Sequence, residues 1–232
     1  MDSGIAAVTI DPDVDRQRDH WRTTFARRRD FLGAAASEPA VAALARFESA
    51  GVRGVLELGS GQGRDTLYFA SAGLAVTALD YADEGLEQLL GAAEGAGLAD
   101  RVLPVSADVR LPLPFASQSF DACYAHMLFC MALSTPDLER LAGEVRRVLR
   151  PGGLLVYTVR TTEDAHFGVG TDHGDSMWEA GGFIVHFFDR ALIDRLATGF
   201  EVLDIAEYTE GKLPRRLVGI TMRKADRSGR RP

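Results

Sequence analysis

The sequence predicts an α/β fold with a mostly parallel sheet, and two observations support this prediction. Short apolar runs alternate with helical patterns along the chain, with no internal repeat or low-complexity stretch. One apolar run, residues 55–58, ends in a glycine-rich turn, which is typical of a buried parallel strand beside a ligand. The chain has 232 residues and a net charge of −7, so we expect one domain with a short additional cap.

The expected elements follow in chain order. An amphipathic helix is predicted over 18–32, and strands over 55–58, 75–79 and 102–109, with a helix starting near residue 64. The clearest helix begins at Thr135, the predicted N-cap, followed by Pro136 at the first position. Further segments are two strands near 119–126 and 153–157, a polar glycine-rich stretch over 161–182, a helix over 190–197, and two last strands over 201–205 and 217–222.

The glycines after the first strand indicate a binding turn. Gly59, Gly61 and Gly63 allow positive φ and carry no Cβ, so the chain can turn sharply and lie against a ligand. A dinucleotide fingerprint needs its third glycine where Arg64 stands, and the Gly-Lys-Ser/Thr end of a P-loop is absent. Both phosphate-binding motifs are therefore disfavoured.

Carboxylates accompany the strands around this turn. Glu57 lies near the end of the first strand, where a buried carboxylate needs a partner. Asp80 ends the second strand and suits a ribose, because a carboxylate accepts hydrogen bonds from both hydroxyls. Asp108 ends the third expected strand. The pattern predicts a nucleoside-binding half-site.

The Glu-x-Gly-x-Gly-x-Gly run at 57–63 resembles motif I of the class I S-adenosylmethionine-dependent methyltransferases. The "LPF…SFD" residues at 113–121 and "LRPGG" at 149–153 extend the resemblance over about residues 50–160. It implies an enzyme with a seven-stranded Rossmann-like sheet closed by an antiparallel hairpin, and S-adenosyl-L-methionine as cofactor. The stretch GQGRDTLYFASAGLAVTALDYA is most similar to small bacterial enzymes of the tellurite-resistance and thiopurine type.

The resemblance also implies site residues. Expected cofactor contacts lie at the strand ends, namely Glu57, Gly59, Ser60, Gly61, Gly63, Asp80, Tyr81, Asp108, Val109, Tyr124 and Ala125. His126, immediately past the fourth strand, is the candidate catalytic residue. The substrate pocket is expected between the 18–32 helix and the insertion 161–188, at Trp21, Phe25, His166, Trp178 and His186. These aromatics also fit plain core packing, and we expect no metal site.

Several functions fit this site. The resemblance favours methyl transfer to a soft nucleophile, a thiol, selenol or metalloid oxyanion, driven by proximity. The main alternative is an O- or N-methyltransferase of secondary metabolism that uses a histidine base, although residues 125–128 lack the Asn/Asp-Pro-Pro-aromatic sequence of relatives that methylate amides and bases. A non-catalytic S-adenosylmethionine-binding module, an NAD-dependent oxidoreductase and a polyamine synthase stay open as other classes.

The remaining expectations concern organisation and partners. We expect a helical cap over 1–48, a methyltransferase domain over 49–224 with a lid at 161–188, and a flexible tail over 225–232. Basic residues form no continuous stripe, which disfavours nucleic acid. No apolar run of membrane-spanning length and no signal segment is visible, so we expect a cytoplasmic protein. We further expect a monomer or homodimer that acts on a small molecule. Cys123 and Cys130 are expected to be buried free thiols.

Overall fold

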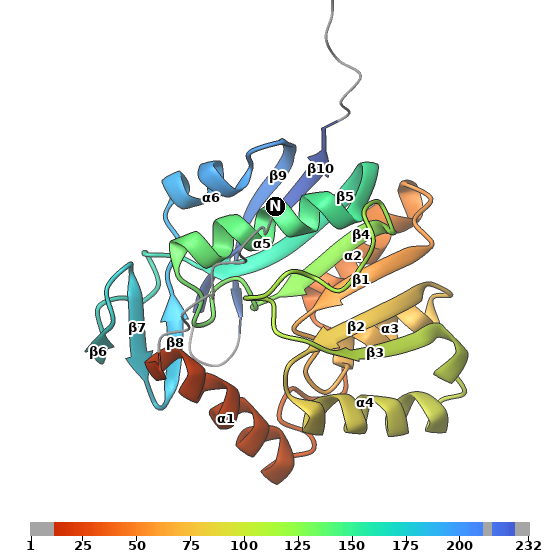
Figure 1. Ribbon diagram of the computed structural model, residues 1–232, viewed down its shortest axis with the longest axis horizontal. Helices are drawn as coiled ribbons and strands as arrows, with labels where there is room; N and C mark the ends of the chain where they lie inside the picture. The colour runs from red at the N-terminus through yellow and green to blue at the C-terminus, as the bar shows by residue number, and fades with distance from the viewer. Residues whose placement is uncertain (1–11, 211–214, 226–232) are drawn as a thin grey trace, which may run out of the picture.

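The computed structural model describes residues 12–210 and 215–225, and its centre is a seven-stranded sheet (Figure 1). The strand order is β3-β2-β1-β4-β5-β10-β9. The first five strands pair in parallel, whereas β10 is antiparallel to both β5 and β9. The strands are β1 Gly54–Leu58, β2 Ala75–Asp80, β3 Val102–Ser106, β4 Phe120–His126, β5 Leu149–Arg160, β9 Phe200–Glu210 and β10 Arg215–Lys224. The predicted mostly parallel sheet with a closing antiparallel hairpin is confirmed.

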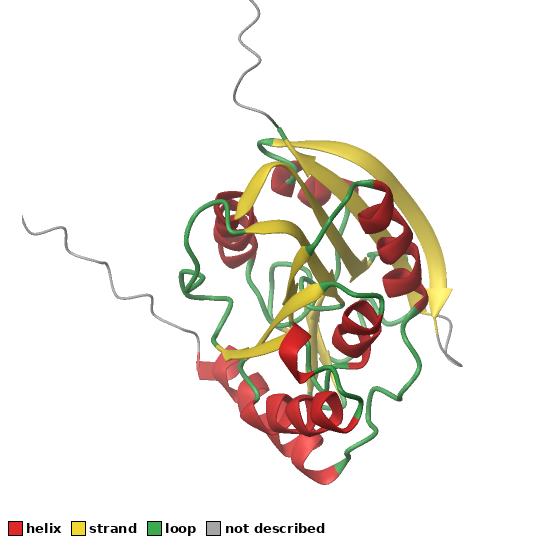
Figure 2. Ribbon diagram, turned by 90° about the vertical axis from the view of Figure 1, so that its right-hand side faces the viewer, coloured by secondary structure: helices red, strands yellow, loops and turns green. Residues whose placement is uncertain are grey.

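Helices cover both faces of the sheet (Figure 2). Alternate residues of a strand point to opposite faces, so Val55 packs toward one helix layer and Leu56 toward the other. The layer on the Val55 side contains α2 Glu38–Ser49, α3 Arg64–Ser71 and α4 Asp83–Gly95. The layer on the Leu56 side contains α5 Thr135–Val148 and α6 Arg190–Leu196, and a short 3-10 turn, η1 Ala99–Arg101, precedes β3.

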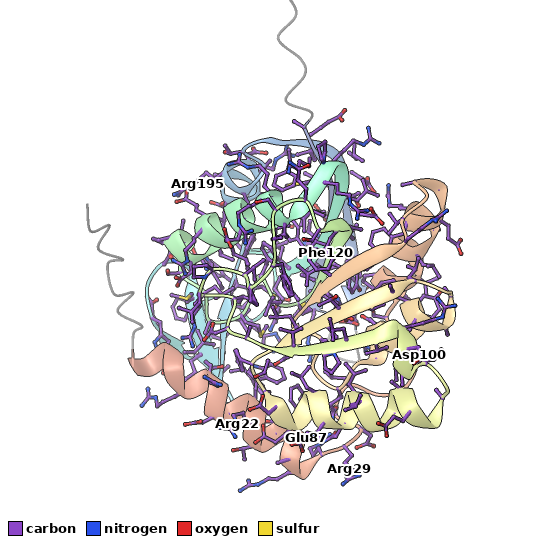
Figure 3. The ribbon with its side chains drawn as sticks, turned by 45° about the vertical axis from the view of Figure 1, so that its right-hand side comes forward. Arg22, Arg29, Glu87, Asp100, Phe120 and Arg195 are labelled. Atoms are coloured by element: carbon purple, nitrogen blue, oxygen red, sulfur yellow. The ribbon has the colours of Figure 1, made fainter. Side chains whose placement is uncertain are left out.

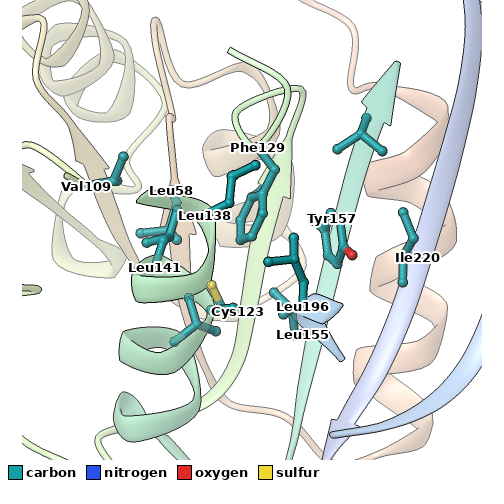
Figure 4. Packing of buried hydrophobic residues seen from close by; sticks show 14 of the residues in the cluster. Leu58, Val109, Cys123, Phe129, Leu138, Leu141, Leu155, Tyr157, Leu196 and Ile220 are labelled. Carbon is teal, nitrogen blue, oxygen red and sulfur yellow. The ribbon is translucent and has the colours of Figure 1, made fainter. Parts of the chain in front are cut away.

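The core under α5 is apolar and closely packed (Figure 4). The rings of Phe129 and Tyr157 stack with their centroids 4.6 Å apart. Cys123 and Cys130 are buried free thiols, as predicted, and burial raises the pKa of both. Neither thiol is therefore a ready nucleophile.

The N-terminus of α5 differs by one residue from the prediction. Ser134 is the N-cap, and it forms a capping box with Asp137. Thr135 does not cap the helix because its hydroxyl donates to the Asp175 carboxylate at 2.7 Å. This bond joins α5 to the insertion, a tertiary contact that the local sequence does not encode.

The first helix, α1 Pro12–Arg27, lies between the insertion and α4 (Figure 1). It ends earlier than expected, because the chain turns over 28–32. Figure 3 shows Arg22 beside α4, and Arg22 forms an ion pair with Glu84 of that helix at 3.0 Å. The parts of the expected cap at 1–11 and of the expected tail at 226–232 lie outside the described residues.

The insertion forms a small antiparallel sheet in place of the expected irregular segment. Its strands are β6 Thr171–Asp172, β7 Met177–Ala180 and β8 Phe183–His186, in the order β6-β7-β8. Gly181 and Gly182 connect β7 to β8 with φ of 61° and 84°, as a two-residue hairpin turn requires. Strands of two and four residues are too short for hydrophobic periodicity to reveal.

Candidate functional site

A cavity of about 830 Å³ opens at the carboxyl ends of the parallel strands. Its volume lies within the range of small-molecule sites, about 300 to 1,000 Å³. One end, here the glycine side, is lined by Glu57, Gly59, Ser60, Gly61, Asp80, Tyr81, Asp108 and Val109. The other end, here the aromatic side, is lined by α1, the insertion, Glu210 of β9 and Arg215 of β10. Such a position is where ligands bind in open α/β sheets.

The glycine turn has the predicted backbone conformation. Gly59, Gly61 and Gly63 have φ of 70°, 53° and 83°. A Cβ on Gly61 would lie 2.8 Å from a methyl carbon of Leu32 and 3.2 Å from the ring of Phe25. A side chain at position 61 would therefore collide with the cap residues that line the cavity. Gly63 starts α3 and packs on Leu89 outside the cavity.

Asp80 organises this turn and faces the cavity. Its carboxylate accepts from the backbone N–H of Gly61 at 2.8 Å and of Ala82 at 2.9 Å. Burial raises the pKa of Asp80, against the lowering effect of these hydrogen bonds. A carboxylate has about four acceptor sites, so lone pairs remain for a ligand's hydroxyl groups.

Glu57 is a buried carboxyl group in the cavity wall. Thr66 donates a hydrogen bond to it from α3. Burial, reinforced by the nearby Asp65, raises the pKa of Glu57 well above its ordinary value. A cationic group of a ligand beside Glu57 would stabilise the ionised form, so this position suits a positively charged ligand.

The hydroxyl of Ser60 gives independent support for a ligand on the glycine side. Ser60 is 4% exposed, and its Oγ has no hydrogen-bond partner among the described residues. Buried hydroxyls are normally satisfied, so a polar ligand atom is the expected partner. Tyr81 and Val109 complete the predicted wall. These residues fit a nucleoside with a polar tail.

Asp108 lines the cavity but is already engaged. Its carboxylate accepts from the Nε and Nη2 atoms of Arg110 at 3.0 and 2.6 Å, and from the Arg110 backbone N–H at 2.9 Å. Burial pushes the pKa of Asp108 upward, but the hydrogen bonds from Arg110 hold it below its ordinary value. Sequence reasoning did not single out Arg110, which also lines the cavity.

Three other predicted residues do not reach the cavity lining. Tyr124 is fully buried, and its hydroxyl lies 3.1 Å from Ser37 Oγ and donates to Asp65 at 3.2 Å. It points into the α2–α3 layer because β4 alternates between the two faces, and Ala125 packs in the opposite layer. His186 is buried, with Nδ1 2.7 Å from the carbonyl oxygen of Leu133. These three assignments are therefore corrected to structural roles.

The aromatic side is built by the contact of α1 with the insertion. The predicted Trp21, Phe25 and Trp178 line it. The ring centroids of Trp21 and Phe183 lie 5.1 Å apart, a distance typical of a favourable aromatic pair. Gln17, missed by sequence reasoning, donates to the carbonyl of Gly182 at 2.8 Å and accepts from the N–H of Ile184 at 3.2 Å. Its side chain joins α1 to both sides of the β7–β8 turn.

Ionisable side chains from three strands line the polar wall of the aromatic side. His126, at the end of β4, places Nδ1 2.8 Å from Thr158 Oγ1 and Nε2 3.6 Å from Glu210 Oε1. Arg160, at the end of β5, donates to Asp164 and lies 2.8 Å from Nδ1 of the predicted His166. Glu210 was not predicted, because only the paired β9–β10 hairpin brings it to His126.

Two structural findings bear on other expectations. In residues 12–210 and 215–225, no helix is long and apolar enough to cross a membrane. Within the same ranges, no group of three or more histidine, cysteine, aspartate or glutamate side chains is arranged to hold a metal ion.

Comparison with known sequences identifies a domain. Residues 55–153 match the family described as "Methyltransferase domain". A sterol 24-C-methyltransferase of Gibberella zeae is 33% identical over 60% of this chain and 42% of its own length. A malonyl-[acyl-carrier protein] O-methyltransferase of Pectobacterium atrosepticum is 36% identical over 44% of this chain and 37% of its own length. The chain thus spans less than half the length of either relative.

Comparison with solved structures supports the fold. A Burkholderia thailandensis 1,6-didemethyltoxoflavin-N1-methyltransferase, with its substrate and S-adenosylhomocysteine bound, has a TM-score of 0.73 at 22% identity, covering 96% of this chain and 94% of that one. A [4+2]-cyclase has a TM-score of 0.68 at 18% identity, covering 95% and 99%. These likenesses to solved structures show the fold. Residues 55–153 match a methyltransferase domain, and the fold around them is shared with solved methyltransferase structures.

Proposed function

We propose that the protein transfers the methyl group of S-adenosylmethionine to a small molecule held on the aromatic side of the cavity. The observation that carries the proposal is the continuity of one cavity from the glycine turn to the aromatic side chains of α1 and the insertion. Two ligands in one cavity can be held in line for displacement, and such positioning contributes about 7 to 11 kcal/mol to lowering the barrier.

The glycine side is assigned to the cofactor, which supplies an electrophilic methyl group on a sulfonium. Asp80 accepts from the ribose hydroxyls, and Ser60 provides its unsatisfied hydroxyl. Glu57 faces the cationic end of the cofactor, because a buried carboxylate with a raised pKa gains most from a positive partner. Gly59 and Gly61 let the backbone approach the ligand.

The aromatic side is assigned to an acceptor with an apolar, partly aromatic body. Phe183, Trp178 and Met131 form its apolar lining, and His126 and Glu210 contribute polar lining to the same cavity. A thiol or selenol needs no protein base, whereas a hydroxyl or amine loses a proton during transfer. The ionisable pair therefore favours a hydroxyl or amine acceptor over the soft nucleophile that the tellurite and thiopurine resemblance predicts.

The organisation expected from sequence is part of this proposal. We assign α1 and α2 to the cap over 1–48, and β6–β8 to a lid over 161–188 within the 49–224 domain. The lid and the cap close the aromatic side together, since Gln17 of α1 is bonded to Gly182 and Ile184.

Mass spectrometry tests the function. The protein is incubated with S-adenosylmethionine and a panel of one phenol, one aryl amine and one aryl thiol of similar shape. The proposal expects a mass gain of one methylene unit on the phenol or amine, together with S-adenosylhomocysteine. Tight binding of S-adenosylhomocysteine without transfer to any acceptor would instead support a non-catalytic binding module.

A further inference from the structure

His126 and Glu210 meet in the cavity wall from distant parts of the chain. His126 Nε2 and Glu210 Oε1 are 3.6 Å apart, and the side chains are 12% and 30% exposed. Both line the cavity, but the carboxylate is the more open of the two. The pair therefore has one enclosed member and one accessible member.

The hydrogen bonds at Nδ1 determine which ring nitrogen of His126 carries the proton. Thr158 is 1% exposed, and its Oγ1 accepts from the backbone N–H of Met127 at 2.9 Å. The Thr158 hydroxyl proton needs an acceptor of its own, and His126 Nδ1 lies 2.8 Å away. Tyr208 is a second neighbour of this hydroxyl. If the hydroxyl donates to Nδ1 and not to Tyr208, Nδ1 carries no proton. Neutral His126 then carries its proton on Nε2.

This tautomer directs a donor at Glu210. With Nδ1 occupied by Thr158 and Nε2 carrying a hydrogen, neutral His126 has no lone pair left for a substrate proton. The carboxylate of Glu210 keeps free acceptor sites. The side chain of His126, 3.6 Å away, contributes most to lowering the pKa of Glu210, and the positive charges of Arg64 on α3 and Arg215 on β10 act in the same direction. Glu210 is consequently ionised at neutral pH.

We propose that Glu210 is the group that accepts the proton of a hydroxyl or amine methyl acceptor, and that His126 is its positioning residue. This inference rests on the proposed function. A lone pair of the acceptor atom forms the bond to the methyl carbon, while the carbon–sulfur bond breaks with its electron pair going to sulfur. The acceptor's proton passes to a carboxylate oxygen of Glu210. Because that proton becomes acidic as the new bond forms, a carboxylate of lowered pKa suffices.

Kinetics of matched variants provide one test. Glu210→Gln keeps the size of the side chain but removes the base. We therefore expect kcat to fall about 100-fold, the lower end of the range for general-base catalysis, with KM little changed. Glu207→Gln is the control, because Glu207 is an exposed glutamate of the same strand outside the cavity. His126→Gln should lose less kcat and shift the acid limb of the pH profile to higher pH, because Glu210 loses the donor that lowers its pKa.

A nitrogen-15 NMR spectrum of the histidine rings tests the tautomer without any acceptor. The chain has five histidines, and the signal absent from His126→Gln assigns residue 126. The inference requires a protonated Nε2 and a bare Nδ1 in the neutral wild-type ring. A protonated Nδ1 would overturn it, since His126 would then offer Nε2 as the base.

Titration with S-adenosylhomocysteine separates this inference from the proposed function. Wild type and Glu210→Gln should bind it equally, because Glu210 lies on the aromatic side. Absence of binding to wild type would refute the proposed function. Wild-type turnover that persists in Glu210→Gln, or transfer to the thiol alone, would overturn the role of Glu210 while leaving methyl transfer intact.

Discussion

The glycine side and the aromatic side of the cavity differ in how the chain builds them. The glycine side is assembled from residues 57–61, 80–81 and 108–109, the ends of three successive parallel strands. The aromatic side needs α1, the ends of β4 and β5, the insertion and the β9–β10 hairpin to converge. The glycine side is therefore held by the sheet. The aromatic side depends on contacts between peripheral segments, and the sequences of such segments vary more than those of the strands.

Asp80 gives the largest expected effect and tests whether the glycine side alone sets cofactor affinity. Removing its charged hydrogen bonds by Asp80→Ala should weaken S-adenosylhomocysteine binding by about 1.5 to 3 kcal/mol, roughly 10- to 150-fold. Titration calorimetry measures the change, and thermal unfolding verifies that the variant is folded, since two backbone N–H groups also lose their acceptor. Asp100→Ala, at an exposed turn, should bind like wild type. Equal affinity in Asp80→Ala would show that the ribose assignment is incorrect.

Glu57 on the glycine side should make the affinity for S-adenosylmethionine depend on pH. Its folded-state pKa is raised, so at lower pH the carboxyl is protonated and offers no charge to a cationic ligand. S-adenosylmethionine affinity should then rise with pH by up to about tenfold per unit until Glu57 is ionised. Glu57→Gln should flatten this dependence. Calorimetry across pH 5 to 8 measures this dependence. An unchanged slope in the variant would show that a group other than Glu57 binds the proton linked to S-adenosylmethionine binding.

The same raised pKa affects stability. Glu57 titrates at higher pH in the folded protein than in the unfolded chain, so it opposes folding once pH exceeds its unfolded value. Chemical denaturation should therefore show Glu57→Gln gaining stability relative to wild type as pH rises from 4 toward 7. A constant difference over that interval would mean that the buried carboxyl is not the titrating group.

Phe183 tests whether the aromatic side is independent of the cofactor. Its ring packs against Trp21 and Phe31 of the cap region, and each aromatic pair contributes about 0.5 to 1.5 kcal/mol. Phe183→Ala should raise KM for the methyl acceptor severalfold while S-adenosylhomocysteine affinity stays near wild type. An equal loss of both affinities would indicate that the two sides are coupled.

Gln17 gives the smallest effect. Gln17→Leu removes two hydrogen bonds between α1 and the β7–β8 turn, worth about 1 kcal/mol each, and we expect the loss to appear mainly as local opening of this contact. Hydrogen exchange should increase at the amide of Ile184 and spare the glycine turn. Faster exchange at Gly61 as well would show that the cap supports the glycine side.

Sequence alone predicted most of the glycine side because its geometry is local. A glycine with positive φ after a strand and an aspartate at the next strand end need only short-range rules to place them. The approach of Glu210 to His126 depends on the pairing of β5, β10 and β9, which no local pattern encodes. Tyr124 was predicted to contact the cofactor because it lies near the end of a strand. The alternation of side chains along that strand instead turns its side chain toward Asp65. The Gly181–Gly182 hairpin turn was available as a signal, but its strands are too short to stand out.

A crystal structure with S-adenosylhomocysteine bound would show directly whether the one cavity has a cofactor side and an acceptor side. We expect the adenosyl group along Gly59 and Gly61, its ribose hydroxyls on Asp80, and the space beside His126, Glu210 and Trp178 left open. Density for the nucleoside among the aromatic side chains, or no binding at saturating concentration, would contradict it.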